Sequence, residues 1–276
     1  MISIDELLAR SALPSTEARI LLAHALRVER PWVIAHGRDP VRDAEERAAA
    51  AFFARRREGE PIAYVTGERE FCSLSLYVTP SVLIPRPETE LVVEQALALI
   101  AGRSAPKLLD LGTGSGAIAV AIAHARRDAE VWATDVLAEA LSVALRNASR
   151  HAAAVRVIQS DWFAALGEER FDVIASNPPY VGERDPHLEE GDLRFEPQTA
   201  LLGGPDGMGC IRTIAAEART HLVPGGWLVF EHGYDQGPAC VRLLVGLGYT
   251  NVVDTQDLSG LPRVCKGQFD VPPRRD

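Results

Sequence analysis

The sequence has few cysteines, and none of them are closely spaced. Its 276 residues contain Cys72, Cys210, Cys240 and Cys265, which lie far apart and form no C-x-x-C pair. Structural zinc sites and the disulfide frameworks of small secreted proteins both depend on closely spaced cysteines. We therefore expect neither, and we expect no metal site. Scattered thiols of this kind fit a reducing compartment such as the cytoplasm.

Long apolar runs and a basic leader are also missing. No stretch approaches the roughly 18 consecutive apolar residues of a membrane-spanning helix. The chain starts MISIDELLAR, with an acidic pair where a secretory signal would be basic. These absences predict a cytoplasmic protein without membrane contact.

An excess of positive charge is missing as well. Lys and Arg total 29 against 38 Asp and Glu, which gives a formal net charge of −9. Non-specific binding to phosphate backbones needs clustered basic side chains that release counterions. We therefore expect no direct nucleic-acid binding, and a protein or small-molecule substrate is the better default.

What the sequence does contain divides it into three parts. Residues 1–69 are rich in Ala, Leu, Arg and Glu and predict a small helical bundle, in which Pro40 stands in the first turn of a helix that runs to Arg57. Residues 70–86 alternate apolar and small polar side chains, which is typical of a hairpin that links two domains. Residues 87–276 form the third part.

The third part alternates strand-like and helix-like segments. After a helix opened by Pro87, near-continuous apolar strands such as KLLDL and FDVIAS alternate with helical segments such as GAIAVAIAHAR. This rhythm predicts an α/β fold with a doubly wound, mostly parallel, seven-stranded sheet covered by helices on both faces. The last segment, RVCKGQFDV, follows TNVVDTQD without room for a crossover helix, so it should pair antiparallel.

A glycine-rich turn joins the first of these strands to its helix. Glycines let the backbone turn sharply and approach a ligand closely, and a helix N-terminus favours polar or anionic groups. Asp135 ends the next strand, about 20 residues further on, where a carboxylate accepts hydrogen bonds from ribose hydroxyls. The turn also satisfies the dinucleotide fingerprint, so by itself it leaves a nicotinamide enzyme open. Its residues are Gly112, Thr113, Gly114, Ser115 and Gly116.

The strand FDVIAS is followed by Asn177-Pro178-Pro179-Tyr180. Proline fixes its own φ, has no N–H and keeps the preceding residue out of the α region. The segment therefore predicts a stiff, extended loop that places an amide side chain, backbone carbonyls and an aromatic ring at the end of a strand. A plain strand stop followed by a turn is the alternative.

In combination, these motifs are more specific. The glycine loop behind Asp110 resembles that of S-adenosylmethionine-dependent methyltransferases, and residues 177–180 resemble the motif of those that methylate nitrogen in a planar group. In this chemistry the oxygens of Asn177 and Pro178 accept the two hydrogens of the amino group, and Tyr180 packs on its planar face. No metal or covalent nucleophile is required.

Two further stretches are weaker candidates. Asp161 follows the third strand and is placed to meet an adenine amino group, with Trp162 stacked on the ring; a capped turn with core aromatics is equally compatible. Glu231 and His232 end the fifth strand and face the same crevice. A structural hydrogen bond is the role that we expect for them.

The sequence resembles, over almost its whole length, the HemK/PrmC family of peptide chain release factor glutamine methyltransferases. The resemblance lies in EPIAYVTGEREF, LIPRPETE, DLGTGSGAIA, SNPPYV, FEPQTAL and FEHGYDQG. It implies that the chain methylates the glutamine side-chain amide in the Gly-Gly-Gln loop of class I release factors, with residues 1–69 helping to hold the factor. Cofactor positions carry over onto 112–116, Asp135, Trp162 and Asn177, and substrate positions onto Asn177, Pro178, Pro179 and Tyr180.

Two other functions stay open. A DNA or RNA adenine amino-methyltransferase acts on the same planar NH₂ group of a flipped base, although the net charge speaks against it. A cofactor-binding interaction protein without catalysis is the other, and the intact motif at Asn177 speaks against that.

Overall fold

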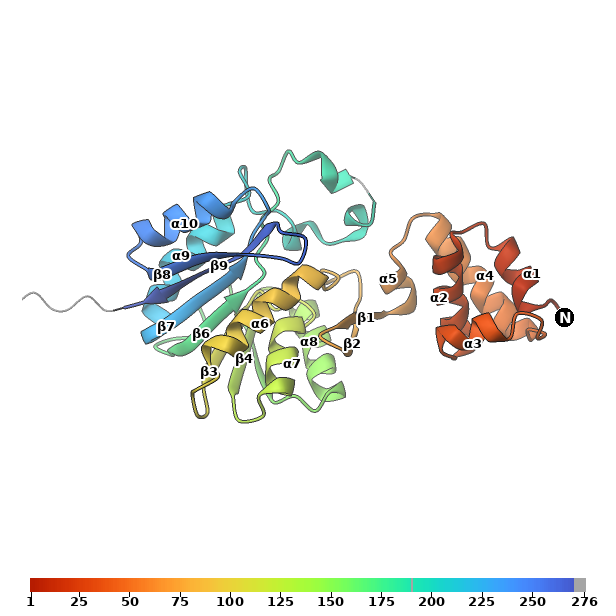
Figure 1. Ribbon diagram of the computed structural model, residues 1–276, viewed down its shortest axis with the longest axis horizontal. Coiled ribbons are helices and arrows are strands. Elements are labelled where there is room, and N and C mark those ends of the chain that lie inside the picture. The colour runs from red at the N-terminus through yellow and green to blue at the C-terminus, as the bar shows by residue number, and fades with distance from the viewer. Residues whose placement is uncertain (190, 271–276) are drawn as a thin grey trace, which may run out of the picture. The chain divides into compact units, whose positions relative to one another are not determined.

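A computed structural model describes residues 1–189 and 191–270 (Figure 1). The chain divides into two compact units. The first contains Met1–Glu68 together with His187–Phe195, and the second contains Arg69–Pro186 and the residues from Glu196 onward. In the described parts of the chain, none of the helices has the length and apolar character needed to cross a bilayer.

The first unit is a helical bundle, as predicted. Leu21, Leu22, Val33 and Phe53 are among the buried side chains of its separate core. Ser3 begins the first helix with a reciprocal capping box to Glu6. The helices are α1 (Ile4–Arg10), α2 (Ser15–Leu26), α3 (Arg30–Ala35), α4 (Asp43–Arg57) and α5 (Ile62–Thr66).

The predicted start of α4 was wrong. The helix begins at Asp43, and Pro40 lies outside it in an isolated antiparallel bridge with Ser3. The adjacent Val41 N–H donates to the carbonyl of Ile2 at 2.8 Å. Pairing with the N-terminal residues therefore holds this segment extended. The proline takes part in a β-bridge and does not start a helix.

The second unit contains the predicted seven-stranded sheet, in the order β5-β4-β3-β6-β7-β9-β8. The first five of these strands are parallel. β9 pairs antiparallel with both β7 and β8, which confirms the prediction for the last segment. The strands are β3 (Lys107–Leu111), β4 (Glu130–Asp135), β5 (Val155–Gln159), β6 (Phe171–Ser176), β7 (Leu222–Glu231), β8 (Thr250–Gln256) and β9 (Pro262–Phe269).

Helices cover both faces of the sheet, so its central strands are buried on both sides (Figure 1). Side chains alternate along each strand: Leu108 and Val173 face one core cluster, and Leu109 and Ile174 face the other. The first cluster includes α6 (Glu90–Leu99), α7 (Ala117–Ala125) and α8 (Ala138–Arg150), and the second includes α9 (Gly209–His221) and α10 (Gly237–Gly246). Short 3₁₀ helices are η1 (Pro87–Thr89), η2 (Pro186–Glu189), η3 (Leu193–Phe195) and η4 (Gln198–Ala200).

Two short strands, β1 (Glu68–Phe71) and β2 (Leu74–Tyr77), form a two-stranded sheet that starts two residues before the segment predicted as a hairpin, residues 70–86, and ends well before its last residue. Its attachment to the rest of the unit includes one buried side chain, Asn147 on α8. The Asn147 amide accepts a hydrogen bond from Tyr77 N at 2.7 Å and donates to the carbonyls of Tyr77 and Ser115 at 2.9 and 2.8 Å. One amide thus joins the hairpin to the glycine loop.

We expect Asn147→Ala to lower the free energy of unfolding by about 3 kcal/mol, because three backbone groups lose their partner in a buried place. Denaturant unfolding measures this. Ser142→Ala, an exposed change on the same helix, is the matched control and should stay within about 0.5 kcal/mol of the parent. Equal stability of the two variants would contradict the role of Asn147.

Candidate active site

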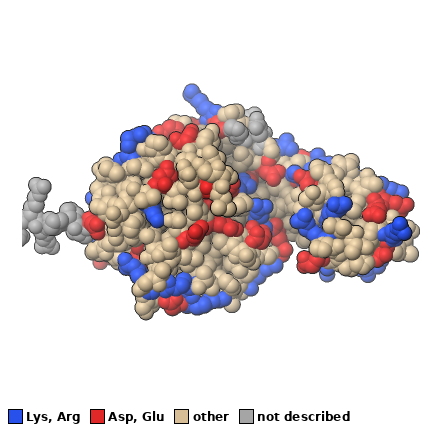
Figure 2. Space-filling view, in the orientation of Figure 1, with Lys and Arg blue, Asp and Glu red and all other residues tan. Residues whose placement is uncertain are grey.

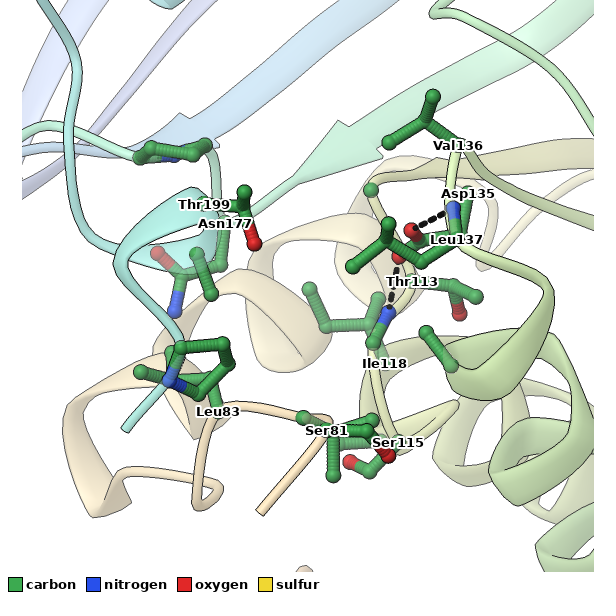
Figure 3. A pocket seen from close by; sticks show the side chains of 18 of the residues that line it. Ser81, Leu83, Thr113, Ser115, Ile118, Asp135, Val136, Leu137, Asn177 and Thr199 are labelled. Carbon is green, nitrogen blue, oxygen red and sulfur yellow. Dashed lines mark hydrogen bonds between the residues drawn. The ribbon is translucent and has the colours of Figure 1, made fainter. Parts of the chain in front are cut away.

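A pocket opens at the carboxyl ends of four parallel strands. Residues that directly follow β3, β4, β5 and β6 line it, and its empty space, with the open solvent at its mouth included, is about 1050 Å³. The chain order of the strands reverses between β3 and β6, and open α/β sheets bind ligands at such a point. Figure 3 shows Asn177 and Thr199 on one side of the pocket and Asp135, Val136 and Leu137 on the other.

The glycine loop forms one wall and is held in place by Asp110. The Asp110 Oδ2 atom accepts hydrogen bonds from Thr113 Oγ1 at 2.6 Å and from Ala119 N at 3.1 Å. Gly112, Gly114 and Gly116 all have φ between 54° and 82°. Residues other than glycine rarely adopt this left-handed conformation. Asp110 therefore ties the loop to the first turn of α7 instead of facing the pocket.

The Asp110 carboxyl is buried, and its Oδ1 atom has no hydrogen-bond partner among the residues that the structure describes. Burial raises the pKa of Asp110 to about 7, and the hydrogen bonds from Thr113 and Ala119 oppose this rise. A folded-state pKa above the unfolded value means that the folded chain holds the proton more tightly. The protonated Asp110 carboxyl therefore contributes to the free energy of unfolding. This contribution is fully present below about pH 4 and is lost as the pH rises to about 7.

The Asp110→Asn variant tests this linkage, because its side chain has nearly the same shape and does not titrate. We expect the free energy of unfolding of the parent, minus that of the variant, to fall by about 4 kcal/mol at most between pH 4 and 7. Denaturant unfolding across this pH range measures the difference, and the contributions of the other groups cancel. A flat difference profile would contradict the raised pKa.

Asp135 ends β4 beside the glycine loop. Its Oδ2 atom accepts a hydrogen bond from Gly114 N at 2.9 Å, and its Oδ1 atom accepts one from Leu137 N at 3.0 Å. Each carboxylate oxygen has a further lone pair. Asp135 therefore ties the glycine loop to the turn after β4 and still offers acceptors to a ligand in the pocket.

The Asn177 amide is held by groups from two other elements. Its Nδ2 atom donates to Thr89 Oγ1 at 3.0 Å, and Thr89 Oγ1 donates to Glu231 Oε2 at 2.6 Å. The Tyr180 hydroxyl donates to the other oxygen of Glu231 at 2.8 Å. Burial raises the pKa of the Glu231 carboxyl, and the hydrogen bonds from Thr89 and Tyr180 oppose this rise. Burial also raises the pKa of the Tyr180 hydroxyl, so it remains a donor.

The backbone after Asn177 is fixed by a second loop that folds back against it. Val181 N donates to the carbonyl of Leu201, and Gly203 N donates to the carbonyl of Val181. The Gln236 side chain donates to the carbonyl of Tyr180 at 3.0 Å. The stiffness predicted from the two prolines is thus reinforced by hydrogen bonds on both sides.

Most of the candidate site residues from the sequence meet in this pocket, and four do not line it. The four are Asp110, Gly116, Pro178 and Tyr180. Trp162 lines the wall beside Gly112, with a left-handed φ of 45°, and Asp161 next to it is exposed. The residues that line the pocket are Gly112, Thr113, Gly114, Ser115, Asp135, Asp161, Trp162, Asn177 and Pro179.

Two segments from which sequence reasoning singled out no individual residue complete the pocket. Residues 81–85 and 197–200 contribute to its lining, and Glu196 joins them by accepting hydrogen bonds from Ile84 N and from the Arg86 guanidinium. Thr89 was also not singled out. A signal for these residues was present, since they lie within or next to the motifs LIPRPETE and FEPQTAL. Neither motif, however, contains a pattern of residue types that by itself indicates a binding or catalytic role.

Charge on the visible surface is mixed. Figure 2 shows acidic and basic side chains interspersed on the visible face of both units. Across residues 1–189 and 191–270, no group of three His, Cys, Asp or Glu side chains is arranged to hold a metal ion.

Comparison with family models gives two matches. Residues 4–67 match the PrmC N-terminal domain, and residues 89–190 match the methyltransferase small domain. The two matches lie on either side of the β1–β2 hairpin.

Known proteins give full-length matches. A protein of Bordetella pertussis described as a release factor glutamine methyltransferase is 49% identical over 97% of this chain and 99% of its own length. One of Escherichia coli with the same description is 45% identical over 95% of each chain. Among solved structures, a methyltransferase from Pyrococcus furiosus has a TM-score of 0.55 and 23% identity over 79% of this chain and 98% of its own. This last likeness concerns the fold alone.

Proposed function

The chain belongs to the release factor glutamine methyltransferase family, and we propose that it methylates the glutamine side-chain amide in the Gly-Gly-Gln motif of class I release factors. The observation that supports this most strongly is identity of 45–50% over nearly the whole of several relatives with that description. The pocket at the end of β6 adds independent support, because it presents an amide acceptor on a stiff loop.

The pocket suits S-adenosyl-L-methionine as the methyl donor. The Asp135 carboxylate would hold the ribose hydroxyls, and Val136, Leu137 and Trp162 give the apolar surface that an adenine ring needs. At Gly114 an added Cβ would meet no atom within 4 Å, so the loop leaves open space beside its backbone. When bound, the cofactor supplies an electrophilic methyl group on a sulfonium sulfur, and S-adenosyl-L-homocysteine is the product.

The protein's own residues solve the problem of a weak nucleophile. The lone pair of an amide nitrogen is delocalised, and its two hydrogens lie in one plane. If Asn177 Oδ1 and the Pro178 carbonyl accept those hydrogens, nitrogen gains electron density as the new N–C bond forms and the S–C bond breaks. The nitrogen releases one proton in the overall reaction. No metal ion takes part in this scheme.

The other candidate residues have supporting roles in this proposal. Pro179 and Tyr180 complete the substrate loop, while Gly112–Gly116 and Asp161 contribute to the cofactor side. Asp110 acts from behind, by fixing the loop. The partner is a release factor, which residues 1–69 help to bind, and the site of action is the cytoplasm. No direct nucleic-acid contact and no membrane contact are part of this proposal.

Transfer of labelled methyl from S-adenosylmethionine tests the proposal directly. The substrates are a purified class I release factor, the same factor with its motif glutamine replaced by alanine, and unmethylated duplex DNA. Label on the intact factor alone is the expected result. Label on DNA alone would overturn the substrate in favour of adenine, while leaving the cofactor and the chemistry at Asn177 in place.

A further inference from the structure

Three side chains from distant parts of the sequence form a continuous hydrogen-bonded series that runs from the pocket wall, at Asn177 and Thr89, to the buried Glu231. Asn177 follows β6, Thr89 ends η1 before α6, and Glu231 ends β7, the sheet neighbour of β6. The distances are 3.0 Å from Asn177 Nδ2 to Thr89 Oγ1 and 2.6 Å from Thr89 Oγ1 to Glu231 Oε2. Only 3% of Thr89 and 1% of Glu231 is exposed, so water does not compete for these bonds.

The donors and acceptors of the three side chains allow only one order of donation, from Asn177 to Thr89 and from Thr89 to Glu231. The hydrogen bonds that Glu231 accepts from Thr89 and Tyr180 favour its ionised form against the effect of burial, and an ionised carboxylate only accepts hydrogen bonds. A threonine hydroxyl has a single hydrogen to donate. Both Glu231 oxygens accept hydroxyl hydrogens, one from Thr89 and one from Tyr180. The Thr89 oxygen therefore has only lone pairs left for Asn177, and only the NH₂ end of that amide fits there. This reasoning determines the amide orientation from the donors and acceptors, since oxygen and nitrogen have nearly the same shape.

Resting on the proposed function, we propose that Thr89 and Glu231 are positioning residues that lock the Asn177 amide so that its oxygen faces the substrate, and that this lock makes the site prefer glutamine over glutamate. A flipped Asn177 would place its oxygen against Thr89 Oγ1 with no hydrogen between them. The locked orientation presents an acceptor to the substrate, which suits an NH₂ group and repels a carboxylate oxygen. The flipped orientation would present a donor and reverse that preference.

The replacement Thr89→Val tests the lock, because valine has a similar shape but no hydroxyl. We expect kcat on the release factor to fall about 10- to 100-fold, below the loss for removing a directly contacting group, while the KM for the factor changes less than about threefold. Thr89→Ser keeps the hydroxyl and should restore most of kcat. Calorimetry should give about the same S-adenosylmethionine affinity for both variants.

A second readout reports on orientation itself. In the presence of S-adenosylhomocysteine, the affinity of the enzyme is measured for the release factor and for the factor with its motif glutamine replaced by glutamate. The parent and Thr89→Ser should prefer glutamine, and Thr89→Val should narrow that preference by about tenfold. A purely structural role of Thr89 would weaken binding of both factors alike.

Glu231→Gln provides an independent variant if Thr89→Val does not fold by circular dichroism. The amide introduced by this replacement can donate to Thr89 and so permits the flipped Asn177, and we expect the same narrowed preference. Parent-like kcat and preference in whichever variant folds would overturn the lock, and so would failure of Thr89→Ser alongside Thr89→Val. An inactive parent enzyme would instead contradict the proposed function, which keeps the two failures distinct.

Discussion

Asn177→Ala is expected to reduce methyl transfer to the release factor about 10³-fold, at the upper end of what loss of one preorganised polar contact costs. The change removes the proposed acceptor of the substrate's amide hydrogens and leaves Thr89 without its donor. The cofactor walls after β3 and β4 are held by Asp110 and Asp135 and do not depend on Asn177. Single-turnover transfer and calorimetry with S-adenosylmethionine measure the two functions separately, and cofactor affinity should weaken only modestly.

Asn251→Gly is the matched control for this experiment. It removes another asparagine amide, from exposed β8 at the edge of the sheet, at a left-handed φ of 48° that glycine adopts readily. Its transfer rate should equal that of the parent. If Asn177→Ala lost cofactor affinity and transfer in equal measure, Asn177 would be a cofactor residue and not the substrate acceptor.

Gly207→Ala is expected to produce the second large effect, because the loop after Asn177 packs directly on this glycine. An added Cβ would overlap the carbonyl oxygen of Tyr180, and the φ of 72° is itself unfavourable for alanine. The backbone of the Asn177 loop must then shift, and a displacement of about 1 Å can cost about 10²-fold in rate. We expect that loss of kcat together with about 3 kcal/mol of stability.

Gly204→Ala separates strain from overlap. Gly204 has a φ of 89°, but an added Cβ would meet no atom within 4 Å. This variant should therefore lose about 1–2 kcal/mol of stability and keep most of its transfer rate. Denaturant unfolding and initial rates on the release factor measure both. Equal activity of the two alanine variants would show that the position of the Asn177 loop does not depend on Gly207.

Much of the second unit was predictable because its sequence signals are local and agree with one another. Near-continuous apolar segments such as FDVIAS indicate strands covered on both faces, and the short connection before the last strand indicates an antiparallel partner. The start of α4 was not predictable in the same way. Proline is common in first helical turns, and only the bridge from Pro40 to Ser3, far away in sequence, excludes it there.

The candidate site shows the same division. Motifs made of consecutive residues, such as the glycine loop and Asn177-Pro178-Pro179-Tyr180, specify a backbone shape and so identify a ligand wall from sequence alone. Asp110 was predicted to bind cofactor, yet its side chain points to Thr113 and Ala119 behind the loop. The direction of a side chain at the end of a strand depends on what packs against it, which a motif does not state.

The sequence alone thus determined the fold class, the order along the chain of the turns that follow the parallel strands, and the family resemblance. These features follow from local periodicity and contiguous motifs. Only the tertiary structure decided how the Asn177 amide is oriented. That orientation depends on Thr89, 88 residues before Asn177, and on Glu231, 142 residues after Thr89. Neither residue type indicates a function by itself. A hydrogen bond has a direction only once its donor and acceptor are in contact, and the sheet brings these three side chains together.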